Sequence, residues 1–156
     1  MSQTCLIYHI VICTYRRQNI INIEHERELY KFMHNYSKRK EVFIRRIGGM
    51  PDHVHILCDI SAKIAVASYV QTLKSESSKF MRVNSHFPDW VCWAKEYGCF
   101  TVDASLCEVR RQYIINQKEH HRYHSFCNEY RFLLDEAGMK DETTIIGDEP
   151  DYKPVI

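Results

Sequence analysis

Residues 48–60 read GGMPDHVHILCDI, in which a glycine pair and a short loop lead into an apolar run. The run from His53 to Ile60 predicts a buried strand, because it is short, rich in aliphatic side chains and preceded by turn residues. Side chains two positions apart lie on the same face of a strand, about 7 Å apart. His53 and His55 could therefore bind one metal ion, since neutral imidazole is a common metal ligand. An arbitrary pair of this kind is more often structural, but its position at the start of a strand favours a site at the rim of the sheet.

Hydrophobic periodicity on both sides of this strand predicts an α+β fold. Strand segments are recognised by β-branched and aromatic residues, and helical segments by apolar side chains three and four positions apart. The order β-α-β-β-α-β is that of a ferredoxin-like sandwich with an antiparallel sheet, to which additional C-terminal helices are attached. The expected elements are strands over residues 6–14, 41–47, 53–60 and 99–103, and helices over residues 24–40, 63–83, 105–122 and 125–138.

The length of 156 residues, 45% of them hydrophobic, fits a single domain with one core. The net charge of +1 conceals an asymmetry: residues 1–134 hold 19 Lys and Arg against 13 Asp and Glu, whereas residues 135–156 hold 2 against 7. We therefore expect one catalytic domain over residues 1–138 and an acidic, flexible tail over residues 139–156. The basic body suits contact with phosphate groups, although short basic runs are more often simply solvated.

Composition also excludes several classes of protein. No window approaches the roughly 18 apolar residues of a membrane-spanning helix, and the run Cys5–Cys13 lacks the flanks of a signal peptide. The seven cysteines are odd in number and contain no C-x-x-C pair, so we expect reduced core thiols in a cytoplasmic protein. The chain is too short for a metal-dependent hydrolase built on an eight-stranded barrel, which needs about 250 residues.

The helix expected from residue 105 has a stripe on which apolar side chains give way to polar ones. A helix that packs along its full length would continue with aliphatic side chains. Tyr113 and Gln117 are four residues apart and therefore lie one above the other, where they could meet the two histidines across a cleft. We expect His120 and His121 to lie past the edge of the core. The stripe consists of Leu106, Val109, Tyr113, Gln117, His120 and His121.

These residues suggest a metal-assisted phosphodiester reaction with a tyrosine nucleophile. A phenol has a pKa near 10, so it attacks only where a cation or a base favours its phenolate. A divalent ion held by His53, His55 and the amide oxygen of Gln117 would keep coordination positions open for a phosphodiester oxygen. Tyr113 would then form a covalent phosphotyrosine that retains the energy of the phosphodiester bond. The predicted reaction is strand transfer rather than hydrolysis.

Four segments of the chain match a known set of motifs: YHIV (residues 8–11), MPDHVHIL (50–57), YGCFTV (97–102) and YIINQ (113–117). In this order they resemble the single-tyrosine HUH transposases, the family of TnpA-like insertion-sequence transposases and REP-associated tyrosine transposases. The resemblance covers about residues 5–130. The second and fourth segments are specific when they occur together, and either alone would be weak.

By this resemblance, His53, His55 and Gln117 are metal ligands, and Tyr113 is the nucleophile that forms a 5′-phosphotyrosine during DNA transposition. The family implies Mg²⁺ or Mn²⁺ as cofactor, single-stranded DNA with hairpin-containing element ends as substrate, and a homodimer. A dimer also follows from the chemistry, since each chain makes one covalent attachment and excision of a segment needs two cuts. Whether Tyr113 acts in the site of its own chain or of its partner stays open.

The main alternative is a nucleic-acid-binding protein, non-catalytic or adopted by its host, that derives from such a transposase. Trp90 and Tyr97 could stack on unpaired bases at about 1–3 kcal/mol each, whereas we expect Trp93 and Phe100 in the core. His9, on a neighbouring strand, is expected either beside the histidine pair or as an ordinary core residue.

Overall fold

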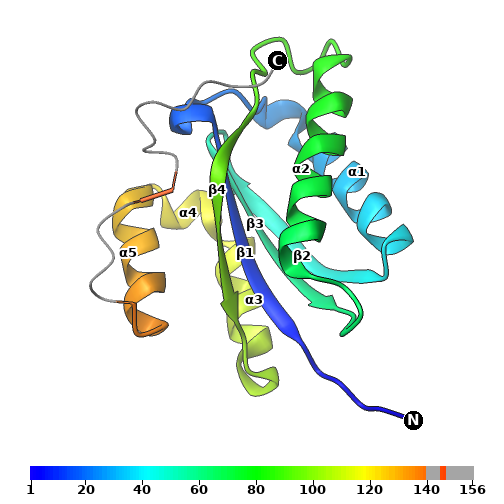
Figure 1. Cartoon of the computed structure of the whole chain (residues 1–156). Coiled ribbons are helices and arrows are strands. Elements are labelled where there is room, and N and C mark those ends of the chain that lie inside the picture. The colour runs from blue at the N-terminus through cyan, green and yellow to red at the C-terminus, as the bar shows by residue number, and fades with distance from the viewer. Residues whose placement is uncertain (140–144, 147–156) are drawn as a thin grey trace.

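A four-stranded antiparallel sheet forms the centre of the fold in the computed structural model, which describes residues 1–139 and 145–146 (Figure 1). The elements are β1 (Ile7–Thr14), α1 (Glu26–Arg39), β2 (Val42–Met50), β3 (His53–Ile60), α2 (Val66–Arg82), β4 (Trp93–Thr101), α3 (Cys107–Ile115), α4 (Gln117–His120) and α5 (Phe126–Glu136). The strand order is β2-β3-β1-β4, so β3 and β1 are the central strands. This order and the C-terminal helices confirm the predicted ferredoxin-like sandwich.

Three boundaries differ clearly from those expected. β2 continues to Met50 rather than ending at residue 47, because Gly48 and Gly49 pair with His55 and Val54 of β3. β4 begins at Trp93 rather than at residue 99, because the buried Trp93 pairs with Thr14 at the end of β1. The helix expected to run to about residue 122 stops at Ile115, where Asn116 takes up non-helical backbone angles (φ −90°, ψ 18°). The short helix α4 resumes after this break.

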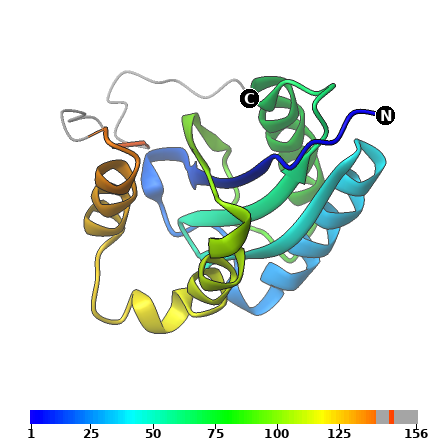
Figure 2. The ribbon, with the colours of Figure 1, turned by 90° about the horizontal axis from the view of Figure 1, so that it is seen from below.

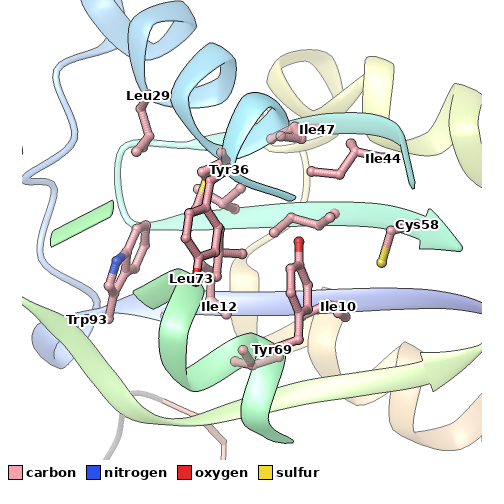
Figure 3. Close-up of a cluster of buried hydrophobic side chains, with 14 of the residues drawn as sticks. Ile10, Ile12, Leu29, Tyr36, Ile44, Ile47, Cys58, Tyr69, Leu73 and Trp93 are labelled. Carbon is pink, nitrogen blue, oxygen red and sulfur yellow. The ribbon is translucent and has the colours of Figure 1, made fainter. Parts of the chain in front are cut away.

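Helices α1 and α2 cover one face of the sheet and enclose the main hydrophobic core (Figures 1 and 3). Strands β1 and β3 contribute alternate side chains to it, among them Ile10, Ile12 and Ile56, each fully buried. Leu29 of α1 and Leu73 of α2 close the core from the helix side. Successive side chains of a strand point to opposite faces, so the residues between these positions face away from this core.

The other face of the sheet carries α3, α4 and α5 (Figure 2). Its apolar contacts form two separate clusters. In one, Ile114 of α3 packs with Leu57; in the other, Phe126 of α5 packs with Val11. The polar side chains buried on the same strands are therefore flanked by apolar packing on two sides.

Part of the segment predicted as an acidic tail is packed against α5. Ile145 and Ile146 are buried, with 2% and 6% of their surface exposed, in the cluster formed around α5. Residues 140–144 and 147–156 lie outside the described residues.

The described part of the chain can be compared with two expectations from composition, one about membrane-spanning helices and one about cysteines. It contains no helix with the length and apolar content that a membrane crossing requires. All seven cysteines lie within it as free thiols, and only Cys5 is exposed. Four of them are buried, as expected for core cysteines, and Cys99 and Cys127 are half-buried.

The glycine pair of β2 lets two other segments approach the strand closely. A Cβ atom on Gly48 would lie 2.6 Å from the backbone oxygen of Ile114 in α3, a separation that real Cβ atoms essentially never show. A Cβ atom on Gly49 would clash with the backbone oxygen of His53. Helix α3, which carries Tyr113, therefore docks on β2 because residue 48 has no side chain.

Substitution of Gly48 by alanine tests this close approach. We expect Gly48→Ala to lower the free energy of unfolding by about 1–3 kcal/mol, since the added methyl group meets backbone rather than a flexible side chain. Urea denaturation followed by circular dichroism measures the change. Ser75→Ala, at an exposed position of α2, should stay within about 0.5 kcal/mol; an equally small effect at Gly48 would contradict the close docking of α3.

Candidate metal and tyrosine site

His53 and His55 open strand β3 and project from the face opposite the main core. Both imidazoles are buried, with 1% and 0% of their surface exposed. Burial of polar rings is costly unless polar partners surround them. Helices α3, α4 and α5 supply most of these partners.

The central partner is Glu129 of α5, which the sequence patterns did not reveal. Its oxygen Oε1 lies 2.8 Å from Nε2 of His55 and 3.4 Å from Nε2 of His53. Glu129 is the only buried acidic residue in the described part of the chain. A signal was present in the sequence, because Glu129 stands three residues after Phe126 and four before Leu133, on the apolar face of its helix.

The second oxygen of this carboxylate, Oε2, accepts hydrogen bonds from the preceding helices. The Tyr113 hydroxyl donates to it over 2.5 Å, and Nε2 of Gln117 donates over 3.0 Å. The amide oxygen of Gln117 lies 3.2 Å from Nε2 of His53. The four residues singled out from the sequence therefore meet within one chain, with Glu129 between the tyrosine and the histidines.

The inward stripe expected on α3 was wrong for its first turns. Leu106 and Val109 are 54% and 69% exposed. Helix α3 instead docks through Cys107 and Ile114, which lie seven residues apart on another face of the helix.

Two further imidazoles complete the ring around the carboxylate. The Nε2 atoms of His120 and His121 each lie 3.2 Å from Oε2 of Glu129. Neither atom meets the geometry of a hydrogen bond, and both are buried without a hydrogen-bond partner. The expectation that these histidines lie past the edge of the core was wrong, because the chain returns to the site after the break at Asn116.

A second layer of contacts orients the two strand histidines. Nδ1 of His53 lies 2.6 Å from Oδ1 of Asp52, the residue before it. Nδ1 of His55 lies 2.7 Å from Nε2 of His9, and Nδ1 of His9 in turn lies 3.2 Å from the guanidinium of Arg110. His9 thus lies beside the histidine pair, the first of the two places expected for it.

Burial and charge set the protonation states of the site. Burial alone would lower the pKa of His53, but hydrogen bonds with Asp52 and Glu129 raise it to about 9. Burial lowers the pKa of His55 to about 4 and outweighs the attraction of Glu129. Burial also favours a raised pKa for Glu129, but the imidazoles around it hold this pKa well below its ordinary value. The Tyr113 hydroxyl has its pKa raised by burial and by Glu129, so it is a neutral phenol facing an ionised carboxylate.

The donor atoms at this point fit a divalent metal ion. The ligand atoms of His53, His55 and Glu129 lie within 4.8 Å of one another. A contact between Nδ1 of His53 and the Asp52 carboxylate leaves Nε2 free to face the centre, the arrangement typical of histidines that bind metals. Two imidazoles, a carboxylate and an amide oxygen together suit first-row metals.

Of the four aromatic residues considered for base stacking, two lie in the core, as expected, and two are partly buried against it. Trp93 and Phe100 are 4% and 9% exposed and belong to the core. Trp90 is half-buried and donates its Nε1 hydrogen to Ser78, while Tyr97 is half-buried on β4. Base stacking on Trp90 or Tyr97 stays a prediction.

Substitution of Glu129 tests its central place. We expect Glu129→Gln to lower the free energy of unfolding of the chelator-treated protein by about 1–3 kcal/mol, because a neutral amide replaces the charged acceptor of several buried donors. Urea denaturation in excess EDTA measures the change. Glu136→Gln, on the same helix and partly exposed beside Arg110, is the matched control and should change stability little. Equal effects of the two substitutions would contradict a central role for Glu129.

Two solved structures resemble this fold. One is a protein from Deinococcus radiodurans R1 classed as a transposase, which is 23% identical with a TM-score of 0.57 over 74% of this chain and 93% of its own. The other is a REP-associated tyrosine transposase bound to a REP hairpin, which is 12% identical with a TM-score of 0.57 over 100% of this chain and 99% of its own. At these identities the likeness shows the fold alone. Among curated proteins, none matches the chain significantly.

A match at the level of sequence shows the family. The profile described as "Transposase IS200 like" matches residues 2–117, well over half of the chain. The matched region contains the histidine pair, Tyr113 and Gln117, and it ends before Glu129. The chain therefore belongs to the family of IS200-like transposases.

Proposed function

We propose that this transposase cleaves and rejoins single-stranded DNA by a metal-dependent reaction through a covalent 5′-phosphotyrosine, as an HUH single-tyrosine enzyme. One observation carries the proposal. The Tyr113 hydroxyl and the imidazole of His55 lie on the two oxygens of the same carboxylate, 2.5 Å and 2.8 Å from it. The nucleophile and the metal-binding histidines are thus within reach of a single phosphodiester.

The metal ligands in this proposal are His53, His55 and Gln117, with Oε1 of Glu129 as an additional donor. The ion is Mg²⁺ or Mn²⁺, and when bound it withdraws charge from a phosphodiester oxygen. Asp52 and His9 hold the two imidazoles in place through their Nδ1 atoms.

Tyr113 carries out the covalent step. A bond forms between its Oη and phosphorus while the bond from phosphorus to the 3′ oxygen breaks, which yields a 5′-phosphotyrosine and a free 3′-hydroxyl. The hydroxyl of Tyr113 donates to Oε2 of Glu129, and this hydrogen bond holds the phenol beside the histidines. The phenol proton passes to solvent water as the bond to phosphorus forms, and the departing 3′ oxygen takes up a proton from water in turn. Attack by another 3′-hydroxyl on the phosphotyrosine then rejoins the strand and releases Tyr113.

A basic cleft beside the site supports DNA as the substrate. It has a volume of about 500 Å³ and is formed between α1, β2 and the α3–α4 break. Positively charged side chains attract a phosphate backbone without regard to sequence. The residues lining the cleft include Arg27, Lys31, Arg45, Arg46, Gln117 and Lys118.

The substrate and assembly follow from the same reaction. The REP-associated relative is bound to a DNA hairpin, and we propose hairpin-containing ends of a mobile element as the substrate here. Excision needs two cuts and each chain offers one nucleophile, so we propose a homodimer. The free thiols fit action in the cytoplasm.

A covalent adduct tests the nucleophile. We expect labelled single-stranded oligonucleotides from the flanks of the gene, incubated with Mg²⁺ or Mn²⁺, to give a protein–DNA adduct that survives SDS. The adduct should disappear in Tyr113→Phe and with EDTA, and persist in Tyr123→Phe, whose hydroxyl belongs to an exposed side chain. Cleavage that persists in Tyr113→Phe would show attack by water instead. DNA binding without an adduct on any flank would favour a non-catalytic DNA-binding protein.

Substitution of His53 separates chemistry from DNA binding. We expect His53→Ala to abolish cleavage while the affinity for single-stranded DNA, measured by fluorescence anisotropy, stays within roughly threefold, because phosphate contacts by basic side chains dominate affinity. His86→Ala, at an exposed position between α2 and β4, should retain both properties. A complete loss of DNA binding in His53→Ala would contradict this separation.

A further inference from the structure

The imidazoles of His120 and His121 are not used by the proposed reaction, yet they are aimed at its centre. Their Nε2 atoms are buried, lack a hydrogen-bond partner and lie 3.2 Å from Oε2 of Glu129. A buried nitrogen without a partner is unfavourable. Two such atoms directed at one carboxylate oxygen require an explanation.

The backbone contact of His121 fixes which nitrogen carries its proton. Nδ1 of His121 lies 3.0 Å from the backbone oxygen of His124, and because a carbonyl only accepts, Nδ1 is the donor. Where Nε2 carries no proton, its lone pair faces the negatively charged carboxylate, a repulsion that either a second ring proton or a bound cation removes. Histidines that bind metals characteristically donate their other N–H to a backbone carbonyl or a carboxylate.

We propose that His120, His121 and Oε2 of Glu129 form a second divalent-metal site, so that the Glu129 carboxylate bridges two ions. The ligand atoms of these three residues lie within 4.8 Å of one another, as do those of His53, His55 and Glu129. Each set uses a different oxygen of the carboxylate. Two imidazoles and a carboxylate oxygen suit Mn²⁺, Co²⁺ or Zn²⁺ better than Mg²⁺.

The second ion lies on the side of the nucleophile. The Tyr113 hydroxyl donates to the same oxygen, Oε2, and its ring contacts that of His120, with centroids 5.3 Å apart. Two divalent ions around one carboxylate leave a net positive charge, which an anionic phosphodiester and a phenolate would offset. This inference builds on the proposed function, but a count of bound ions tests it without DNA.

The experiment is a titration of the metal-free full chain with Mn²⁺, followed by electron paramagnetic resonance. The signal of Mn²⁺ that remains free in solution gives the number of bound ions by difference. Two Mn²⁺ ions that share a carboxylate give a magnetically coupled spectrum. We expect two ions per chain and a coupled spectrum for the unmodified protein. His120→Ala should bind one ion without coupling, and His53→Ala should also bind one. His124→Ala, whose ring stacks on His120 but supplies no ligand to the site, should still bind two.

The outcomes are distinct. One ion per chain in the unmodified protein, or two without magnetic coupling, overturns the inference. Circular dichroism checks that each variant is folded. If His120→Ala unfolds, His121→Gln takes its place. Two coupled ions in whichever of these two variants is folded would also overturn the inference. Two coupled ions without a Tyr113 adduct would refute the proposed function but support the second metal site. A Tyr113 adduct formed by a protein that binds one ion would support the proposed function and refute the second metal site.

Discussion

The carboxylate of Glu129, buried among imidazoles, is the interaction on which the site depends. A charged group inside a protein is tolerated only where donors surround it. Here Tyr113, Gln117 and His55 satisfy its oxygens. These partners come from a strand and from helices on either side of the α3–α4 break, so the carboxylate also ties those elements together. The histidine pair and a tyrosine distant in sequence become neighbours through this one side chain.

The fold accommodates this polar centre because the apolar packing differs between the two faces of the sheet. One face of the sheet is covered by α1 and α2 and is filled with aliphatic side chains. On the other face, apolar packing splits into a cluster around α3 and a cluster around α5. His53 and His55 are buried on this second face. The glycine pair preceding them matters as much as the histidines, because Gly48 allows α3 to approach.

The central part of this architecture could be predicted from the sequence, since alternation on the strands and helical spacing of apolar residues are local signals. The position of His53, His55, Tyr113 and Gln117 in known motifs likewise singled them out. Glu129 lies outside the matched motifs, and its place on the apolar face of α5 indicates burial but not which residues surround it. The inward turn of His120 and His121 was missed for a related reason: it depends on the break at Asn116, which no proline or glycine marks in the sequence.

The carboxylate that completes the centre lies on α5, the last helix in the described part of the chain, whereas the paired histidines lie on the third strand. Because translation starts at the N-terminus, the sheet and the tyrosine are made before the residue that joins them. A nascent chain would hold its imidazoles without their acidic partner until α5 has been translated and has docked. Competence for the proposed reaction would thus be acquired only after α5 has been made.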